Sequence, residues 1–223
     1  MSKKKLKGKI VLVTGASRGL GFETALILAK NGAHILAVGR SVSNLEKLSD
    51  AVKALHGSCT LIPLDLEKSN SIENMSNSIS NRWQKLDIIV HCASSTLQMM
   101  PVIQSFNKET NYNISLNLIV SIRLISSFDS LLKKSSNALV VYTTDEQPKK
   151  YNSLYNASKK ASEEIFSSYK SENERLGVKV YIHRPKPMDS GIRLKLYPGE
   201  DKKKLAETQV EALKLKEKII DLI

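Results

Sequence analysis

Tyr155 and Lys159 are residues of the types, and at the spacing, that proton transfer requires. Residues four positions apart lie on one face of a helix, one turn from each other. A tyrosine has an ordinary pKa of about 10 and is therefore a poor base at neutral pH. A neighbouring ammonium group stabilises the phenolate and lowers this pKa, which suits proton exchange with an alcohol or carbonyl oxygen. A Tyr-x-x-x-Lys spacing also occurs by chance in many helices. The pair therefore indicates a function only together with other motifs in the sequence.

A glycine-rich turn near the start of the chain is the second chemical signal. Residues 14–21 read Thr-Gly-Ala-Ser-Arg-Gly-Leu-Gly, directly after the β-branched run 9–13 and before apolar residues at helical spacing. This strand–turn–helix context is that of a dinucleotide-binding fingerprint. Gly15 permits the tight turn, Gly19 lets the backbone approach a pyrophosphate, and Gly21 lets the helix pack closely on the strand. The helix N-terminus offers free N–H groups to the phosphates.

Two arginines are placed where they could select the cofactor. Arg40 follows the run 34–39, at the position where an acidic residue would bind the ribose 2′-hydroxyl group of NAD. An arginine there favours the 2′-phosphate of NADP, and Arg18 in the turn could bind the same phosphate. Each could also be an ordinary surface charge. Their joint placement favours NADP(H) over NAD(H).

The ends of the next two predicted strands carry further candidate contacts to a cofactor. Asp65 could accept a hydrogen bond from the adenine amino group while Leu66 packs against the ring, although a turn or helix N-cap aspartate is the alternative. The small residues at 92–94 let the backbone pass close to the cofactor. We expect His91 to end its strand as a hydrogen-bonded core histidine rather than to act as a base.

Asn117 and Thr144 are candidate partners of the tyrosine and lysine. Asn117 stands in an apolar helical stretch, where a lone asparagine needs a hydrogen-bonding partner, and a buried structural bond would satisfy it. Thr144 follows the fifth predicted strand, eleven residues before Tyr155. The position of Tyr155 and Lys159 after this strand, downstream of the glycine-rich turn, makes the pair a specific signal.

Strand-like apolar runs alternate with segments of helical periodicity along the chain. Strands are predicted at 9–14, 34–39, 59–64, 86–91, 137–143 and 178–183, and helices at about 19–31, 43–56, 69–84, 106–133, 151–175 and 201–222. Repeated βα units build a doubly wound parallel α/β sheet of the Rossmann type, a three-layer αβα arrangement with its ligand crevice at the carboxyl ends of the strands. We expect a single domain over residues 1–223. In the last helix, the pattern predicts a buried side made of Leu205, Val210, Leu213 and Ile220.

The composition fits a folded protein in a reducing compartment. Of the 223 residues 41% are apolar, and Cys59 and Cys92 give neither a disulfide framework nor a metal-ligand spacing. The first apolar run has five residues, too short for a signal peptide or a membrane span, so we expect a soluble cytoplasmic protein. The net charge of +12 could serve nucleic-acid or membrane binding. We interpret it as a solvated basic surface, because the lysines gather at the two ends of the chain.

On these residues the chain resembles the short-chain dehydrogenase/reductase family, from about residue 8 to about residue 193. The resemblance is carried by 14–21, Asp65, 91–94, Asn117, Thr144, Tyr155, Lys159 and Pro185. It implies an NAD(P)-dependent oxidoreductase that interconverts a carbonyl and an alcohol by hydride transfer. In this reading Tyr155 is the general acid/base, Lys159 lowers its pKa and binds the nicotinamide ribose, and Asn117 holds a water that links Lys159 to solvent. Segments 86–91 and 184–193 are most similar to the bacterial YciK-type branch.

The resemblance yields a defined set of candidate residues and partners. The cofactor-binding candidates are Gly15, Ser17, Arg18, Gly19, Leu20, Gly21, Arg40, Asp65, Leu66, Cys92, Ala93, Ser94, Tyr155, Lys159 and Pro185, and the catalytic candidates are Asn117, Thr144, Tyr155 and Lys159. No metal, nucleic acid or membrane partner is expected. Because the family's subunit interface uses the helices at 106–133 and 151–175, we expect a homodimer, with a homotetramer as the alternative.

The chain departs from the family pattern near the chemistry. Thr144 replaces the usual serine, the residues at 92–94 replace Asn-Ala-Gly, and Lys186 replaces the glycine after Pro185. The spacing from Thr144 to Tyr155 is about two residues shorter than usual, and we expect the usual last strand to be absent. The alternative function is therefore a catalytically weakened NADP(H)-binding sensor or partner protein.

Overall fold

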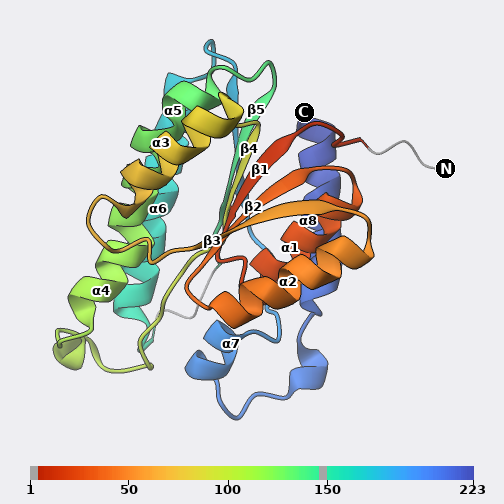
Figure 1. Cartoon of the computed structure of the whole chain (residues 1–223). Helices are drawn as coiled ribbons and strands as arrows, with labels where there is room; N and C mark the ends of the chain where they lie inside the picture. The colour runs from red at the N-terminus through yellow and green to blue at the C-terminus, as the bar shows by residue number, and fades with distance from the viewer. Residues whose placement is uncertain (1–4, 146–149) are drawn as a thin grey trace.

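The computed structural model describes residues 5–145 and 150–223, which form a six-stranded parallel sheet between two layers of helices (Figure 1). The strands are β1 (Ile10–Thr14), β2 (His34–Gly39), β3 (Ser58–Pro63), β4 (Ile88–His91), β5 (Ala138–Thr143) and β6 (Val178–His183). Their order is β3-β2-β1-β4-β5-β6, so the order reverses between β1 and β4. Loops that leave β1 and β4 part there and open a crevice at the carboxyl ends of the strands. The predicted doubly wound sheet is confirmed, with six strands in the described residues.

Helices cover both faces of the sheet (Figure 1). One layer holds α1 (Gly19–Lys30), α2 (Val42–Ala54) and α8 (Thr208–Leu222), and the other holds α3 (Ser71–Trp83), α4 (Thr110–Ile114), α5 (Val120–Leu132) and α6 (Ser153–Glu172). The short helix α7 (Gly191–Leu196) lies beyond the carboxyl ends of the strands. The helices of these two layers thus leave the carboxyl ends of the strands uncovered, and the loops after the strands meet there.

The alternation of side chains along the strands divides the core in two. Val11 and Val13 of β1 pack with Leu28 of α1 and Leu215 of α8, whereas Leu12 between them packs on the α3, α5 and α6 side. Successive side chains of a strand point to opposite faces, so a strand buried on both faces needs a continuous apolar run. This is why the strand predictions lie within two residues of the observed bounds.

The predicted helix at 201–222 is wrong over its first turns. Helix α8 begins at Thr208, and the residues before it form a 3-10 turn at Lys202–Lys204 and an extended segment. In that segment Ala206 pairs with Met188 of the loop after β6. The predicted buried side is also partly wrong: Val210 and Leu213 are each 43% exposed, because the buried face of α8 is made of Glu211, Ala212, Leu215 and Ile219.

The predicted helix at 106–133 is interrupted by a π-helical turn. It starts at Thr110, passes through the π turn Ser115–Ile119 and continues as α5. The stretch Thr110–Leu132 is long and apolar enough to cross a membrane by length and composition, with a hydropathy of 1.4. Its residues Val120, Leu124 and Phe128 are nevertheless part of the core under the sheet. The apolar residues of this stretch are thus explained by their packing under the sheet.

Two sequence predictions concern residues that lie outside the described ranges. The basic N-terminal segment includes residues 1–4, and the shortened loop between Thr144 and Tyr155 includes residues 146–149. The expectation of a single domain over 1–223 stays a prediction.

Candidate active site

A cleft opens at the carboxyl ends of the strands, where the loops after β1 and β4 diverge. Its volume is about 1360 Å³, including the part that is open to solvent. Every predicted cofactor-binding residue lines it: Gly15, Ser17, Arg18, Gly19, Leu20, Gly21, Arg40, Asp65, Leu66, Cys92, Ala93, Ser94, Tyr155, Lys159 and Pro185. Thr144 lines it as well. Residues that are far apart in the sequence therefore meet in one crevice, as the topology requires.

The glycine-rich turn forms the floor of this cleft. Gly15 has a φ of +71°, and a Cβ atom there would lie 2.9 Å from the backbone nitrogen of Ala93. At Gly21 a Cβ atom would lie 2.4 Å from the carbonyl oxygen of Gly15, so the helix packs on the turn itself as well as on the strand. Gly19 has a φ of +57° and faces open space. A side chain at Gly19 would project into the room that a pyrophosphate needs.

The first turn of α1 is suited to hold phosphates. It contains no acidic residue among those described, and the side chain of Arg18 at the N-cap makes no capping hydrogen bond. The N–H groups of such a first turn have no partner within the helix and attract anions. With the open space at Gly19, the turn fits a dinucleotide cofactor.

Two arginines, Arg40 and Arg18, lie in the lining of the cleft but point in different directions. The guanidinium group of Arg40 donates a hydrogen bond to the Tyr112 hydroxyl group and lies 5.8 Å from the centre of its ring. Arg18 reaches in the other direction, to Gly191 at the start of α7, where a Cβ atom would lie 3.2 Å from its Nη1 atom. Both guanidinium groups remain in the lining of the cleft, where a phosphate could meet them.

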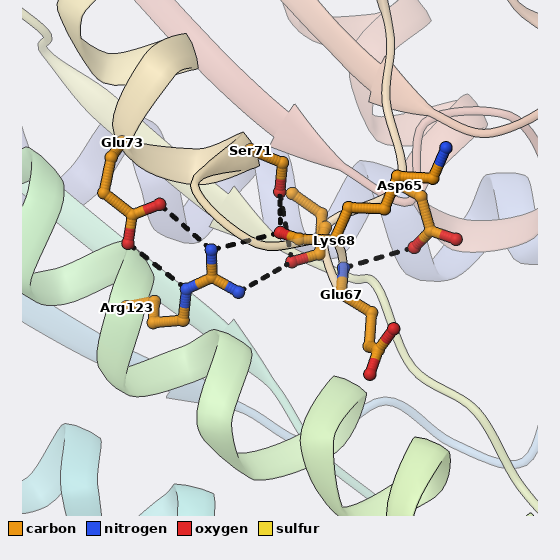
Figure 2. A network of polar contacts seen from close by, with 7 residues as sticks. Asp65, Glu67, Lys68, Ser71, Glu73 and Arg123 are labelled. Carbon is orange, nitrogen blue, oxygen red and sulfur yellow. Dashed lines mark hydrogen bonds and ion pairs between the residues drawn. The ribbon is translucent and has the colours of Figure 1, made fainter.

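Asp65 and Leu66 belong to a loop whose shape is fixed by hydrogen bonds (Figure 2). The Asp65 carboxylate accepts a hydrogen bond of 3.2 Å from the backbone N–H of Glu67, so the turn-aspartate alternative is realised. The same side chain lines the cleft. Asp65 can therefore hold its own loop and still face an adenine ring.

Arg123 of α5 ties this loop to the helix layer (Figure 2). Its guanidinium group forms a two-pronged ion pair with Glu73, at 3.2 and 2.9 Å, and donates to the carbonyl oxygens of Lys68 at 3.2 Å and Leu66 at 3.5 Å. This pairing also lowers the pKa of Glu73. Sequence reasoning missed Arg123, because only the fold brings residue 123 to residues 66–73.

Tyr155 and Lys159 lie one turn apart on α6, and both are almost fully buried. The Lys159 ammonium group donates to the carbonyl oxygen of Thr143 at 2.8 Å and lies 4.5 Å from the ring centre of Tyr142. Thr144 is 3% exposed, and its backbone N–H bonds to the carbonyl oxygen of His183. The end of β5 thus fixes the position of Lys159 through the Thr143 carbonyl oxygen, and Thr144 with its candidate hydroxyl group follows directly.

The hydroxyl group of Tyr155 donates a hydrogen bond of 2.7 Å to the carboxylate of Asp145. Burial and the neighbouring Asp145 charge raise the pKa of Tyr155 well above its usual range, against a smaller opposite effect of Ser94. This direction is opposite to the lowering that the resemblance implies for a lysine beside the tyrosine. Sequence reasoning missed Asp145, although an acidic residue directly after Thr144 was a visible signal.

Asn117 lies in the wall behind the cleft and not in its lining. Its Oδ1 accepts hydrogen bonds from Ser94 Oγ and the Ser95 N–H, and its Nδ2 donates to the Ser95 carbonyl oxygen and Ser158 Oγ, all within 3.0 Å. Its carbonyl oxygen accepts from Ser121 and Ser162. The π turn presents these groups to α6, as π turns often do near functional sites. Asn117 therefore has the structural bonds that its burial requires, and its role toward a water stays a prediction.

His91 and Cys92 end β4 beneath the cleft. His91 contacts Thr14 Oγ1 at 2.7 Å and Ser121 Oγ at 3.3 Å, and burial lowers its pKa to about 3. The expected hydrogen-bonded core histidine is confirmed. Burial raises the pKa of the Cys92 thiol to about 11, so this side chain lines the cleft as a neutral group.

The loop after β6 closes the cleft on the far side. Pro185 and Lys186 line it, and the backbone N–H of Lys186 donates to the carboxylate of Glu211 on α8 at 3.2 Å. Helix α7 follows, and its Arg193 pairs with Glu200 through two bonds of 2.6 Å. The sequence analysis did not predict α7, because six residues are too few to show a helical period.

Comparisons with known proteins agree with this geometry. The family model for short chain dehydrogenases matches residues 9–201. An uncharacterized oxidoreductase of Staphylococcus epidermidis is 29% identical over 219 residues, which cover 94% of this chain and 90% of that protein. The match to this relative thus extends over nearly the whole length of both chains.

Solved structures share the fold. The Escherichia coli oxidoreductase YciK has a TM-score of 0.89 at 24% identity, over 96% of this chain and 91% of that one. A metagenomic short-chain oxidoreductase in complex with NADP has a TM-score of 0.84 at 21% identity, over 97% of this chain and 92% of that one. At these identities the likeness concerns the fold.

Proposed function

Because the chain belongs to the short-chain dehydrogenase family of NAD(P)-dependent oxidoreductases, we propose that it interconverts a carbonyl and an alcohol with NADP(H). A bound NADPH would supply the hydride for the carbonyl carbon. One observation supports the proposal above all. Tyr155, Thr144 and Lys159 line the same cleft as the glycine-rich turn. One group of residues binds a dinucleotide and the other can handle the proton of an alcohol.

Tyr155, Thr144 and Lys159 each have a part in this reaction. Tyr155 donates its hydroxyl proton to the carbonyl oxygen during reduction and takes it back during oxidation. The Thr144 hydroxyl group donates a hydrogen bond that orients the same oxygen, in the place of the family's serine. Lys159, held by the Thr143 carbonyl oxygen, binds the nicotinamide ribose and adds a positive charge near Tyr155. The protein contributes position and charge to chemistry that the cofactor provides.

The substitution Tyr155→Phe tests the proposal. It removes the proton donor but keeps the ring, so we expect carbonyl reduction to fall about 10²- to 10⁴-fold. The affinity for NADPH, measured by calorimetry, should stay close to that of the parent. A matched control is Tyr181→Phe on β6, outside the lining of the cleft.

Retained turnover in Tyr155→Phe would contradict the assignment of the acid/base. If the parent protein binds NADPH but oxidises it with no aldehyde or ketone of a broad panel, the sensor function is the better description. Three departures from the family motivate that second candidate, namely Thr144, the residues at 92–94 and Lys186.

The preference for NADP(H) is supported by charge. Arg18 and Arg40 line the cleft, and the residue after β2 is basic where NAD-binding folds use an acid. The adenosine end of the cleft therefore offers the cation of Arg40 to a 2′-phosphate. Binding of NADPH and NADH by calorimetry separates the two cofactors.

We also propose a homodimer, in the cytoplasm, built on the α4–α6 layer. Ile119 and Ile122 are 42% and 39% exposed on that layer and offer apolar surface to a second copy. Size-exclusion chromatography with light scattering measures the oligomeric state.

A further inference from the structure

Asp145 occupies a place in the cleft that the proposed reaction leaves without a role. Its carboxylate accepts the Tyr155 hydroxyl proton at 2.7 Å, and both side chains line the cleft. Asp145 directly follows Thr144, so one short segment after β5 carries the orienting hydroxyl group and a carboxylate. A carboxylate that accepts a hydrogen bond from a hydroxyl group at this distance is a strong acceptor.

Several other groups face Tyr155 and must be weighed with Asp145. Tyr142 of β5 acts to raise the pKa of Tyr155, and Ser94 of the loop after β4 acts to lower it. Lys159 of α6 is directed to the Thr143 carbonyl oxygen. From the loop after β6, Arg193 acts on Asp145, but its guanidinium group is already paired with Glu200. Lys186 lines the same cleft. Among the residues that the structure describes, Asp145 is thus the anionic group in hydrogen-bonding contact with the Tyr155 hydroxyl group.

Resting on the proposed reaction, we propose that Asp145 is a positioning residue that keeps the proton on Tyr155 until a substrate oxygen replaces the carboxylate as its acceptor. A phenolate beside this carboxylate would be a pair of like charges in a buried place, which is unfavourable. Tyr155 therefore stays in its proton-donating form to higher pH than it would without Asp145. The burial and charge that raise the Tyr155 pKa act in this direction.

The proton balance of the reaction is unchanged by this role. In reduction the O–H bond of Tyr155 breaks, an O–H bond forms on the substrate oxygen, and the carbonyl carbon receives the hydride. Tyr155 is left as a phenolate that takes a proton from solvent. Asp145 accepts a hydrogen bond before and after this turnover and is neither consumed nor oxidised. Its charge makes the phenolate short-lived, so the enzyme returns to the donating form.

The substitution Asp145→Asn removes the charge and keeps the size of the side chain. We expect the titration of Tyr155 to move to lower pH by about one unit or more, since a charge in contact shifts a pKa by that amount. The measurement is NMR of protein labelled with ¹³C at the hydroxyl-bearing ring carbon of tyrosine, over the pH range in which circular dichroism shows a folded protein. The Tyr155→Phe variant assigns the signal among the seven tyrosines.

The kinetic readout is the pH profile of kcat/KM for carbonyl reduction. In Asp145→Asn the alkaline fall in rate should begin about one pH unit earlier than in the parent. A variant that was merely damaged would lose rate at every pH and keep the alkaline midpoint of the parent. Asp145→Glu should restore the parent profile. The control is Asp50→Asn, an exposed carboxylate of α2 that pairs with Lys53.

The outcomes separate the inference from the proposed function. Identical Tyr155 titrations in the parent and Asp145→Asn overturn the role of Asp145, whatever the turnover. A shifted titration together with a carbonyl reductase activity in the parent supports both. A shifted titration without any turnover supports Asp145 as the group that holds the proton and rejects the carbonyl reaction.

Discussion

At the scale of single residues, Arg40 and Asp145 mark the two ends of the cleft. Arg40 follows β2, where the adenosine part of a cofactor would lie, and Asp145 stands beside Tyr155 at the reacting end. The phosphate end thus attracts an anion, while the reacting end holds a proton.

Arg40→Met tests the phosphate end. It keeps the aliphatic stem and removes the cation, so the affinity for NADPH should fall tenfold or more, at about 1.5–3 kcal/mol for a charge-assisted hydrogen bond. The affinity for NADH, which lacks the 2′-phosphate, should change little. Calorimetry measures both, with Arg175→Met at an exposed position outside the cleft lining as control. Equal losses for the two cofactors would contradict a role in phosphate binding.

At the scale of elements, α5 determines the shape of the loop that carries Asp65. Arg123 joins the helix to Glu73 and to two carbonyl oxygens of the loop (Figure 2). A carbonyl oxygen that accepts from a guanidinium group is fixed in direction. Arg123 itself does not line the cleft. It nevertheless holds in place the loop that carries Asp65 at the adenine end.

Arg123→Met releases the loop at residues 65–71. We expect weaker binding of 2′,5′-ADP and a free energy of unfolding lower by about 1–3 kcal/mol, because the loop carbonyls and Glu73 lose a charged donor. Binding of nicotinamide mononucleotide, which has no adenine, should be unaffected. Lys53→Met serves as a control, since its ion pair with Asp50 is exposed and worth about 0–1 kcal/mol. An equal loss for both ligands would mean that the helix supports the fold and not the adenine end.

At the scale of the whole molecule, α8 closes the core next to β1. Leu215 is fully buried among Val11, Val13 and Leu28, whereas Leu213 on the same helix is 43% exposed. The two ends of the described chain thus share one half of the core.

Leu215→Ala and Leu213→Ala compare the two faces of α8. The first substitution should lower the free energy of unfolding by about 2–5 kcal/mol, because it leaves a cavity in the core. The second should change it by about 0.5 kcal/mol or less. Denaturant titration followed by circular dichroism measures both. Similar losses would show that the C-terminal helix is held by something other than its apolar contacts.

Sequence patterns predict those features that depend on local periodicity or on a motif. The strands, the glycine-rich turn at 14–21 and the approach of Tyr155 and Lys159 to it are of this kind. The start of α8 is not, because the Lys-rich pattern continues through a segment that pairs with Met188. The contact of Asp145 with Tyr155 depends on the path of the loop between them, and the reach of Arg123 depends on the packing of α5. Neither contact produces a periodic pattern of residues that could be recognised in the sequence.

The position of α8 against α1 also bears on the order in which the chain can fold. Helix α1 is made from residues 19–30, and the helix that covers it comes from residues 208–222. The side of α1 that α8 covers therefore stays exposed on a ribosome until residues 208–222 are made. Contacts of such large sequence separation form late and slowly, and exposed apolar surface invites association during the wait.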